Sequence, residues 1–139
     1  MPEVEILKIE LIQNLMLWDR YWGFKESLKD KNESPNTKLI WHGTGLNDPK
    51  IIYEGEFGLN INYSKQGMWG EAIYFAVNAA YSCPGYSHKV SDGTHKVFLA
   101  EVSLGKEIEL ASDNKLREPP KGYNSVRGFT NNSVVHMVY

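Results

Sequence analysis

The first third of the chain shows two apolar patterns with different periods. From Val4 to Gln13, apolar side chains alternate with polar ones, so that Leu7, Ile9 and Leu11 share one side of an extended chain. This period of two predicts a half-exposed strand. From Asn14 onward the apolar residues recur every three or four positions, which predicts a helix with Asn14 as its N-cap.

Short elements are predicted after this helix. The apolar run Lys38–Trp41 indicates a buried strand that ends in a tight turn. Asp48 and Pro49 suit the N-cap and first position of a short helix, and Gly55 suits its end. Residues 58–70 are rich in Gly, Asn and Ser and predict a long loop, and loops of this length in a compact domain are often functional.

The second half of the chain is dominated by short apolar segments. Residues 78–81 predict a turn or two of helix. Five segments predict strands: Ile73–Ala76, Lys96–Ser103, Glu107–Leu110, Tyr123–Val126 and Val134–Tyr139. The pattern therefore predicts a mostly β, α+β chain with one substantial helix. No repeat or internal boundary divides it, so residues 1–139 are expected to form a single domain.

Composition narrows the class of protein. The hydrophobic content of 42% and the aromatic content of 12% fit a soluble globular domain. The net charge of −2 gives no support for non-specific nucleic-acid binding. No apolar run is long enough to cross a bilayer, and the N-terminus lacks the layout of a secretion signal. Cys83 is the single cysteine and fits a reducing compartment, so a cytoplasmic or nuclear location is expected.

Three segments carry the candidate chemistry: Trp41-His42-Gly43-Thr44, the run from Gly67 to Ala76, and Asn78-Ala79-Ala80-Tyr81-Ser82. In this order and spacing they resemble the catalytic domain of the poly(ADP-ribose) polymerase family. The similarity is closest to its mono-ADP-ribosylating, macrodomain-associated branch. The segments 9–14 and 123–126 also resemble that branch, so the resemblance covers essentially the whole chain.

The resemblance implies an α+β ADP-ribosyltransferase fold, in which two packed, mainly antiparallel sheets form an NAD-binding cleft beside one N-terminal helix and short helices. It implies NAD⁺ as co-substrate, no metal, and transfer of a single ADP-ribose to a macromolecular acceptor. The expected acceptor is a protein side chain, the chain itself included, and a nucleic-acid acceptor is not excluded. The domain is expected to be one part of a larger protein, and the family continues into one more strand after the position of Tyr139.

The resemblance also assigns roles to individual residues. Gly43 is expected to pair with the nicotinamide carboxamide through its N–H and C=O, and Ser82 to add a hydroxyl to the same amide. Tyr74 and Tyr86 are expected to sandwich the nicotinamide ring, a contact that contributes about 0.5–1.5 kcal/mol per ring. His42 is expected to donate to the adenosine ribose hydroxyl. Three neighbours complete the predicted binding set: Thr44, Phe75 and Ala76.

The third catalytic position departs from the polymer-forming members, which carry a glutamate there. Counting from Ser125 places this position at Val135, with Val134 as the one-residue alternative, and neither is acidic. His136 should point to the opposite face from Val135. Without the carboxylate we expect transfer of one unit and no polymer. A second departure is Ala72, where the family usually has glycine.

Other candidate sites have weaker support in the sequence. Cys83, His88 and His95 match no common zinc spacing and lack a fourth ligand. Three carboxylates on neighbouring predicted strands are expected to form a solvated face: Glu101, Glu107 and Glu109. The glycine-rich loop has neither a phosphate-loop ending nor a Rossmann context, so hydride transfer is not the expected use of NAD⁺.

Two functions therefore remain open. One is an NAD⁺-dependent mono-ADP-ribosyltransferase, with His42, Tyr74 and Val135 at the catalytic positions. The alternative is an inactive or weakly active domain that binds NAD⁺ or ADP-ribose and serves as an interaction module. The oligomeric state is left undetermined.

Overall fold

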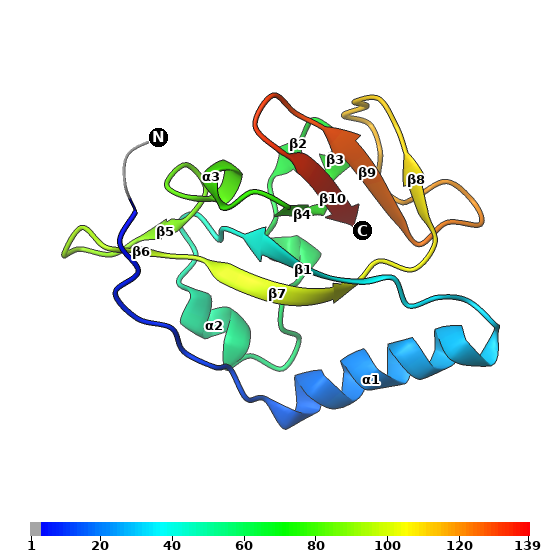
Figure 1. The fold of residues 1–139 in the computed structure, drawn as a ribbon, viewed down its shortest axis with the longest axis horizontal. Coiled ribbons are helices and arrows are strands. Elements are labelled where there is room, and N and C mark those ends of the chain that lie inside the picture. The colour runs from blue at the N-terminus through cyan, green and yellow to red at the C-terminus, as the bar shows by residue number, and fades with distance from the viewer. Residues whose placement is uncertain (1–3) are drawn as a thin grey trace.

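A six-stranded sheet organises residues 4–139, the part of the chain that the computed structural model describes (Figure 1). Its strands stand in the order β7-β1-β4-β10-β9-β8. Their bounds are β1 Thr37–His42, β4 Ile73–Ala76, β7 Phe98–Ser103, β8 Glu107–Glu109, β9 Ser125–Phe129 and β10 Val134–Val138. All neighbours are antiparallel except β8 and β9, which are parallel. The predicted α+β class is therefore confirmed.

Two small sheets accompany the large one. β2 (Gln66–Gly67) pairs with β3 (Gly70–Glu71), and β5 (His88–Lys89) pairs with β6 (His95–Lys96). The β2–β3 hairpin lies inside the predicted long loop 58–70, which also holds the 3-10 turn η1 (Ile61–Tyr63). The loop prediction was wrong in this part, because two-residue strands are too short to show a period.

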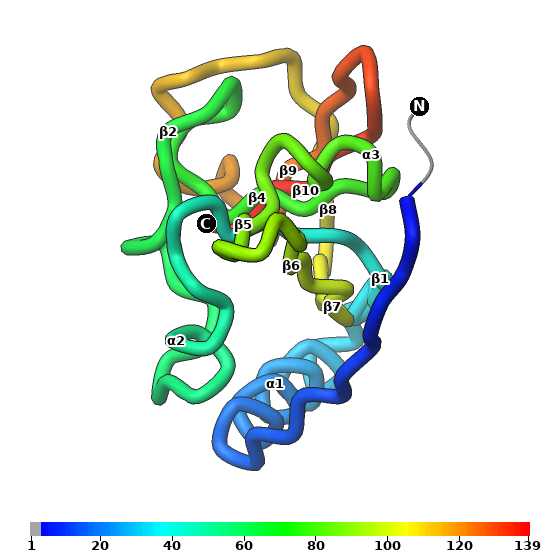
Figure 2. Tube along the Cα trace, turned by 90° about the vertical axis from the view of Figure 1, so that its left-hand side faces the viewer, coloured from blue at the N-terminus to red at the C-terminus, as the bar shows by residue number. Residues whose placement is uncertain are grey.

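The helices start where their capping residues predict. α1 (Leu15–Asp30) begins after Asn14, whose side chain accepts the N–H of Leu17 at 3.2 Å. α2 (Pro49–Tyr53) begins after Asp48, whose side chain accepts the N–H of Lys50 at 3.0 Å. α3 is the short helix Ala79–Ser82. Figures 1 and 2 both show α1 below β7, at the bottom of the molecule.

The strand predicted before α1 was wrong. Residues 4–13 contain no strand, and Leu7, Ile9 and Leu11 are 68%, 85% and 84% exposed. A strand requires a neighbour that accepts and donates its main-chain hydrogen bonds. Among the described residues no strand pairs with this segment, which runs beside the main body of the molecule in Figure 2.

Two apolar clusters fill the interior. The first, which we call the Trp69 core, comprises Trp69, Ala72, Ala76, Val126, Val135 and Met137. The second, the Ile40 core, comprises Ile40, Ile73, Phe75 and Leu104. Since side chains alternate along a strand, β4 directs Ala76 into the first core and Phe75 into the second.

The expected strand at Lys38–Trp41 forms, but it is not buried throughout. Ile40 is 2% exposed, whereas its neighbour Leu39 is 67% exposed. One face of β1 is therefore open, and an apolar run alone did not reveal this. Within residues 4–139, no helix combines the length and apolar character needed to span a membrane.

Candidate active site

His42 and Gly43 stand at the end of β1, next to the middle of β4. Nδ1–H of His42 donates to the carbonyl oxygen of Tyr74 at 2.7 Å, and its ring lies 5.3 Å from that of Phe75. Burial lowers the pKa of His42, although the bond to the Tyr74 carbonyl acts in the opposite direction. The neutral ring with its proton on Nδ1 leaves Nε2 as an acceptor. A ribose hydroxyl would therefore donate to His42, the reverse of the direction expected from the resemblance.

Gly43 lies against the backbone of Tyr86 and Ser87. A Cβ at position 43 would overlap the carbonyl group of Tyr86 and lie 2.8 Å from the Ser87 nitrogen, so only glycine fits here. Within residues 4–139, neither the N–H nor the C=O of Gly43 takes part in a hydrogen bond. One donor and one acceptor are therefore available on the same residue.

Ser82 is the last residue of α3, and Tyr86 lies in the segment that follows this helix. Ser82 is 3% exposed, and its hydroxyl makes no hydrogen bond to any residue of the described range 4–139. The ring of Tyr86 stacks on that of Tyr81, with centroids 5.2 Å apart and planes at 28°. Burial and the neighbouring hydroxyl of Tyr86 raise the pKa of Tyr81 to about 12, with a smaller contribution from Tyr74. Tyr81 is therefore a neighbour of both predicted sandwich residues.

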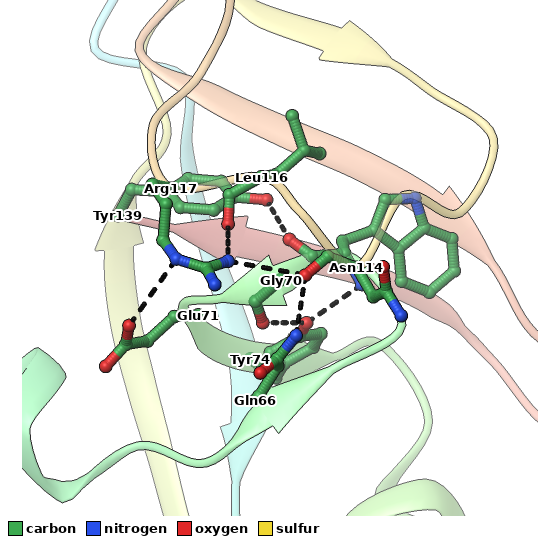
Figure 3. A network of polar contacts seen from close by, with 9 residues as sticks. Gln66, Gly70, Glu71, Tyr74, Asn114, Leu116, Arg117 and Tyr139 are labelled. Atoms are coloured by element: carbon green, nitrogen blue, oxygen red, sulfur yellow. Dashed lines mark hydrogen bonds and ion pairs between the residues drawn. The ribbon is translucent and has the colours of Figure 1, made fainter.

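The ring of Tyr74 is held by the β2–β3 hairpin (Figure 3). Its hydroxyl donates to the carbonyl of Gly70 at 2.7 Å and accepts the N–H of Trp69 at 3.0 Å. A Cβ at Gly67 would lie 2.6 Å from the tip of the same ring. Burial raises the pKa of Tyr74, so its hydroxyl stays protonated at neutral pH.

The hairpin is in turn tied to residues 114–117 (Figure 3). Nε2 of Gln66 donates to the carbonyl of Asn114 at 2.8 Å, and the guanidinium of Arg117 lies 3.8 Å from the carboxylate of Glu71. Gly70 has φ of +81°, and a Cβ there would overlap the backbone of Leu116. A left-handed glycine is therefore needed where the hairpin meets this loop.

The side chains of the other predicted binding residues are engaged elsewhere. The hydroxyl of Thr44 donates to the carbonyl of Asn47 at 2.6 Å. Phe75 is packed in the Ile40 core and Ala76 in the Trp69 core. The main chains of Phe75 and Ala76 pair with neighbouring strands, and the carbonyl of Thr44 accepts the N–H of Asn47 at 3.2 Å.

Val135 is fully buried in the Trp69 core, on the sheet face that also carries Tyr74. Val134 alternates to the other face. His136 does so too, as expected, and its Nδ1–H donates to the carboxylate of Glu107. The expectation that Glu107 lies on a solvated face was wrong, because its side chain is 9% exposed in this pair. Glu101 is exposed, and Glu109 lies 3.8 Å from the guanidinium of Arg127.

Two surface hollows, of about 360 and 410 Å³, share Met68 and Ser112. None of the predicted nicotinamide residues lines either of them. The metal site considered from the sequence at Cys83, His88 and His95 does not form. His88 bonds the carbonyl of Gly45, and His95 bonds the hydroxyl of Ser87. Across the described residues, no group of three potential ligands could hold a metal ion.

The sequence of this chain matches a known protein family. Residues 2–137 match the model of the poly(ADP-ribose) polymerase catalytic domain. This chain belongs to that family. The match extends over the end of β1, the β2–β3 hairpin, β4, α3 and most of β10.

Curated relatives of this poly(ADP-ribose) polymerase domain cover the same region. A probable poly(ADP-ribose) polymerase of Dictyostelium discoideum is 39% identical over 73% of this chain and 32% of its own length. The human protein mono-ADP-ribosyltransferase PARP3 is 37% identical over 78% of this chain and 21% of its length. The mouse protein mono-ADP-ribosyltransferase PARP11 is 31% identical over 86% of this chain and 42% of its length. The chain thus spans less than half the length of these relatives.

Several residues that shape the poly(ADP-ribose) polymerase site were not assigned a role from the sequence. Tyr81 and Gly67 belong to the recognised blocks, yet the stack on Tyr86 and the contact with Tyr74 depend on folded geometry. Tyr139 donates to the carbonyl of Trp69 at 2.6 Å across a separation of 70 residues. No local pattern in the sequence indicates such a pairing.

Proposed function

We propose that this domain binds NAD⁺ and transfers one ADP-ribose unit to a protein side chain, with release of nicotinamide. In this reaction the bond between the ribose and the nicotinamide nitrogen breaks, the ribose bonds to the acceptor oxygen, nitrogen or sulfur, and the acceptor loses its proton. Family membership and the names of the mono-ADP-ribosyltransferase relatives support this chemistry.

The observation that carries the proposal is the unpaired N–H and C=O of Gly43 beside Tyr86. A primary carboxamide offers the complementary acceptor and donor, and each such hydrogen bond contributes about 0.5–1.5 kcal/mol net. Ser82, a residue that is 3% exposed, adds a hydroxyl that can bond to the same amide.

The remaining residues orient the dinucleotide. Nε2 of His42 accepts a hydroxyl of the adenosine ribose, while its Nδ1–H stays on Tyr74. The rings of Tyr74 and Tyr86 contact the nicotinamide from two sides. Holding the ribose and the leaving group in one geometry supplies much of the rate enhancement.

The third catalytic position, Val135, lacks the carboxylate that elongation requires. In the polymer-forming members that the chain resembles, a glutamate at this position holds a hydroxyl of the nicotinamide ribose and activates it for elongation. The valine supplies no such group, and its side chain is enclosed by the Trp69 core. The acceptor then attaches to the first ADP-ribose, and no chain grows.

Two measurements test the proposal on the chain of 139 residues. Calorimetric titration with NAD⁺ and with 3-aminobenzamide should give binding. Incubation with radiolabelled NAD⁺ and a protein mixture should give single labelled bands without a ladder. Binding without labelling would identify an NAD⁺-binding module that lacks turnover, a ladder would exclude single transfer, and no binding would exclude both functions.

A further inference from the structure

Trp69 lies between the hydroxyls of two tyrosines, Tyr74 and Tyr139, both of which Figure 3 labels. Its N–H, in the peptide before its Cα, donates to the hydroxyl of Tyr74 at 3.0 Å. Its carbonyl, in the peptide after its Cα, accepts the hydroxyl of Tyr139 at 2.6 Å. Trp69 with its two flanking peptides therefore joins Tyr139 to Tyr74, whose ring the proposed function places against nicotinamide.

Tyr139 reaches this peptide from the residue after β10. Met137 of β10 pairs with Tyr74 of β4, and both tyrosines pack against the Trp69 core. Burial raises the pKa of Tyr139, and the nearby groups of Tyr74 and Asp113 raise it further. Its hydroxyl therefore remains a donor at neutral pH.

Trp69 itself has little freedom to move. Nε1–H of its indole donates to the carbonyl of Leu110 at 3.0 Å, and the ring packs on Gly128, where a Cβ would overlap it. Its side chain is thus fixed at one end, which leaves rotation of the two peptides that flank its Cα as the remaining motion. The bond from Tyr139 opposes rotation of the peptide between residues 69 and 70.

The hydroxyl of Tyr74 depends on the main chain on both sides of this peptide. It accepts the N–H of Trp69 and donates to the carbonyl of Gly70, so both of its hydrogen bonds go to the segment 69–70. Gly67 closes the remaining side of the ring tip. Where the main chain of Trp69 and Gly70 is placed, the ring of Tyr74 must follow.

We propose that Tyr139 is a positioning residue for the nicotinamide pocket, acting through the main chain of Trp69 and Gly70 on the ring of Tyr74. This inference rests on the proposed function. Removing the Tyr139 hydroxyl leaves the Trp69 carbonyl without its donor and loosens the segment 69–70. Affinity for NAD⁺ then decreases about fivefold, the effect of one hydrogen bond. The rate of transfer at saturating NAD⁺ changes less than the affinity.

The test compares Tyr139→Phe with Tyr63→Phe, a change at a 44% exposed tyrosine of η1 whose hydroxyl bonds to nothing in residues 4–139. NAD⁺ affinity is measured by calorimetry for both variants and for Tyr139→Phe in a Tyr74→Phe background. Carbon-13 labelling of tyrosine rings reports on Tyr74 in the ligand-free protein, with Tyr74→Phe identifying its signals.

Tyr139→Phe should shift the Tyr74 ring signals and weaken NAD⁺ binding, and Tyr63→Phe should do neither. In the Tyr74→Phe background the effect of Tyr139→Phe should be much smaller, because residue 74 then has no hydroxyl that bonds the segment 69–70. A lower melting temperature with unchanged affinity and unchanged Tyr74 signals would overturn the positioning role. If the unaltered chain fails to bind NAD⁺, the proposed function fails, whereas the ring signals still decide whether Tyr139 positions Tyr74.

Discussion

Gly43 and Tyr86 touch through their main chains, so closely that no side chain fits between them. The contact brings the unpaired groups of Gly43 next to the residue predicted to cover nicotinamide. It also links β1 to the segment after α3 without any side-chain interaction. A sequence change at this point therefore acts on the backbone of two segments at once.

Gly43→Ala should abolish NAD⁺ binding and destabilise the domain. The added methyl would meet the carbonyl of Tyr86 and the Ser87 nitrogen, and such overpacking costs about 1–3 kcal/mol. Calorimetric titration and thermal unfolding measure the two effects. Gly85→Ala is the matched control, since a Cβ there meets nothing within 4 Å and should leave both properties unchanged. Full affinity in Gly43→Ala would contradict the assignment of the carboxamide site.

Gly67→Ala should weaken NAD⁺ binding with little loss of stability. The new methyl would lie 2.6 Å from the tip of the Tyr74 ring, which is the movable end of a side chain. The ring is therefore displaced while the hairpin persists, and we expect about a tenfold loss of affinity, or about 1.4 kcal/mol. Gly23→Ala, in α1 with no neighbour within 4 Å, serves as the control. Equal affinities in the two variants would show that the position of Tyr74 does not matter.

The stability of the domain should depend on pH through His42. Burial keeps its pKa below the usual value of 6.5, so the unfolded chain takes up a proton at a higher pH than the folded protein. The free energy of unfolding contributed by His42 is therefore complete above about pH 6.5 and decreases as the pH falls through that value.

NAD⁺ affinity should decrease at a lower pH, where the folded protein takes up the proton at its lowered pKa, because a protonated ring offers no acceptor at Nε2. Melting temperatures of the wild type and of His42→Gln, compared at about pH 8 and about pH 5.5, check the predicted pH dependence of the stability. The difference between the two proteins should be smaller at the lower pH. A difference that stays constant would show that His42 does not titrate in this way.

Val135→Glu should destabilise the domain without producing polymer. The carboxylate would be enclosed by the Trp69 core, and an uncompensated buried charge costs about 3–5 kcal/mol. Val134→Glu, one residue earlier on the other face and half-buried, should cost much less. Chemical denaturation and labelling with NAD⁺ measure stability and product length. Equal stability of the two variants would contradict the strand register described here.

The sequence predicted best those features that depend on neighbouring residues. Asn14 and Asp48 were identified as N-caps because a cap acts on residues two or three positions ahead. The apolar segment Ile73–Ala76 predicted β4, and alternation predicted the opposite faces of Val135 and His136. The segment 4–13 shows the limit of this reasoning, since its alternation is compatible with a strand but does not supply a neighbouring strand.

Long-range pairings were beyond prediction from one sequence. Glu107 was expected on a solvated face, yet β8 and β10 bring it together with His136, 29 residues away, in a buried pair. The bond between Tyr139 and Trp69 has the same origin. The candidate site was found because its blocks resemble a family, while the support behind Tyr74 became visible only in the fold.

The most direct test is a crystal structure of the domain with 3-aminobenzamide. The account predicts that the carboxamide oxygen accepts the N–H of Gly43, that its nitrogen donates to the Gly43 carbonyl, and that the ring lies between Tyr74 and Tyr86. An inhibitor bound elsewhere, or one whose amide makes no contact with Gly43, would contradict it.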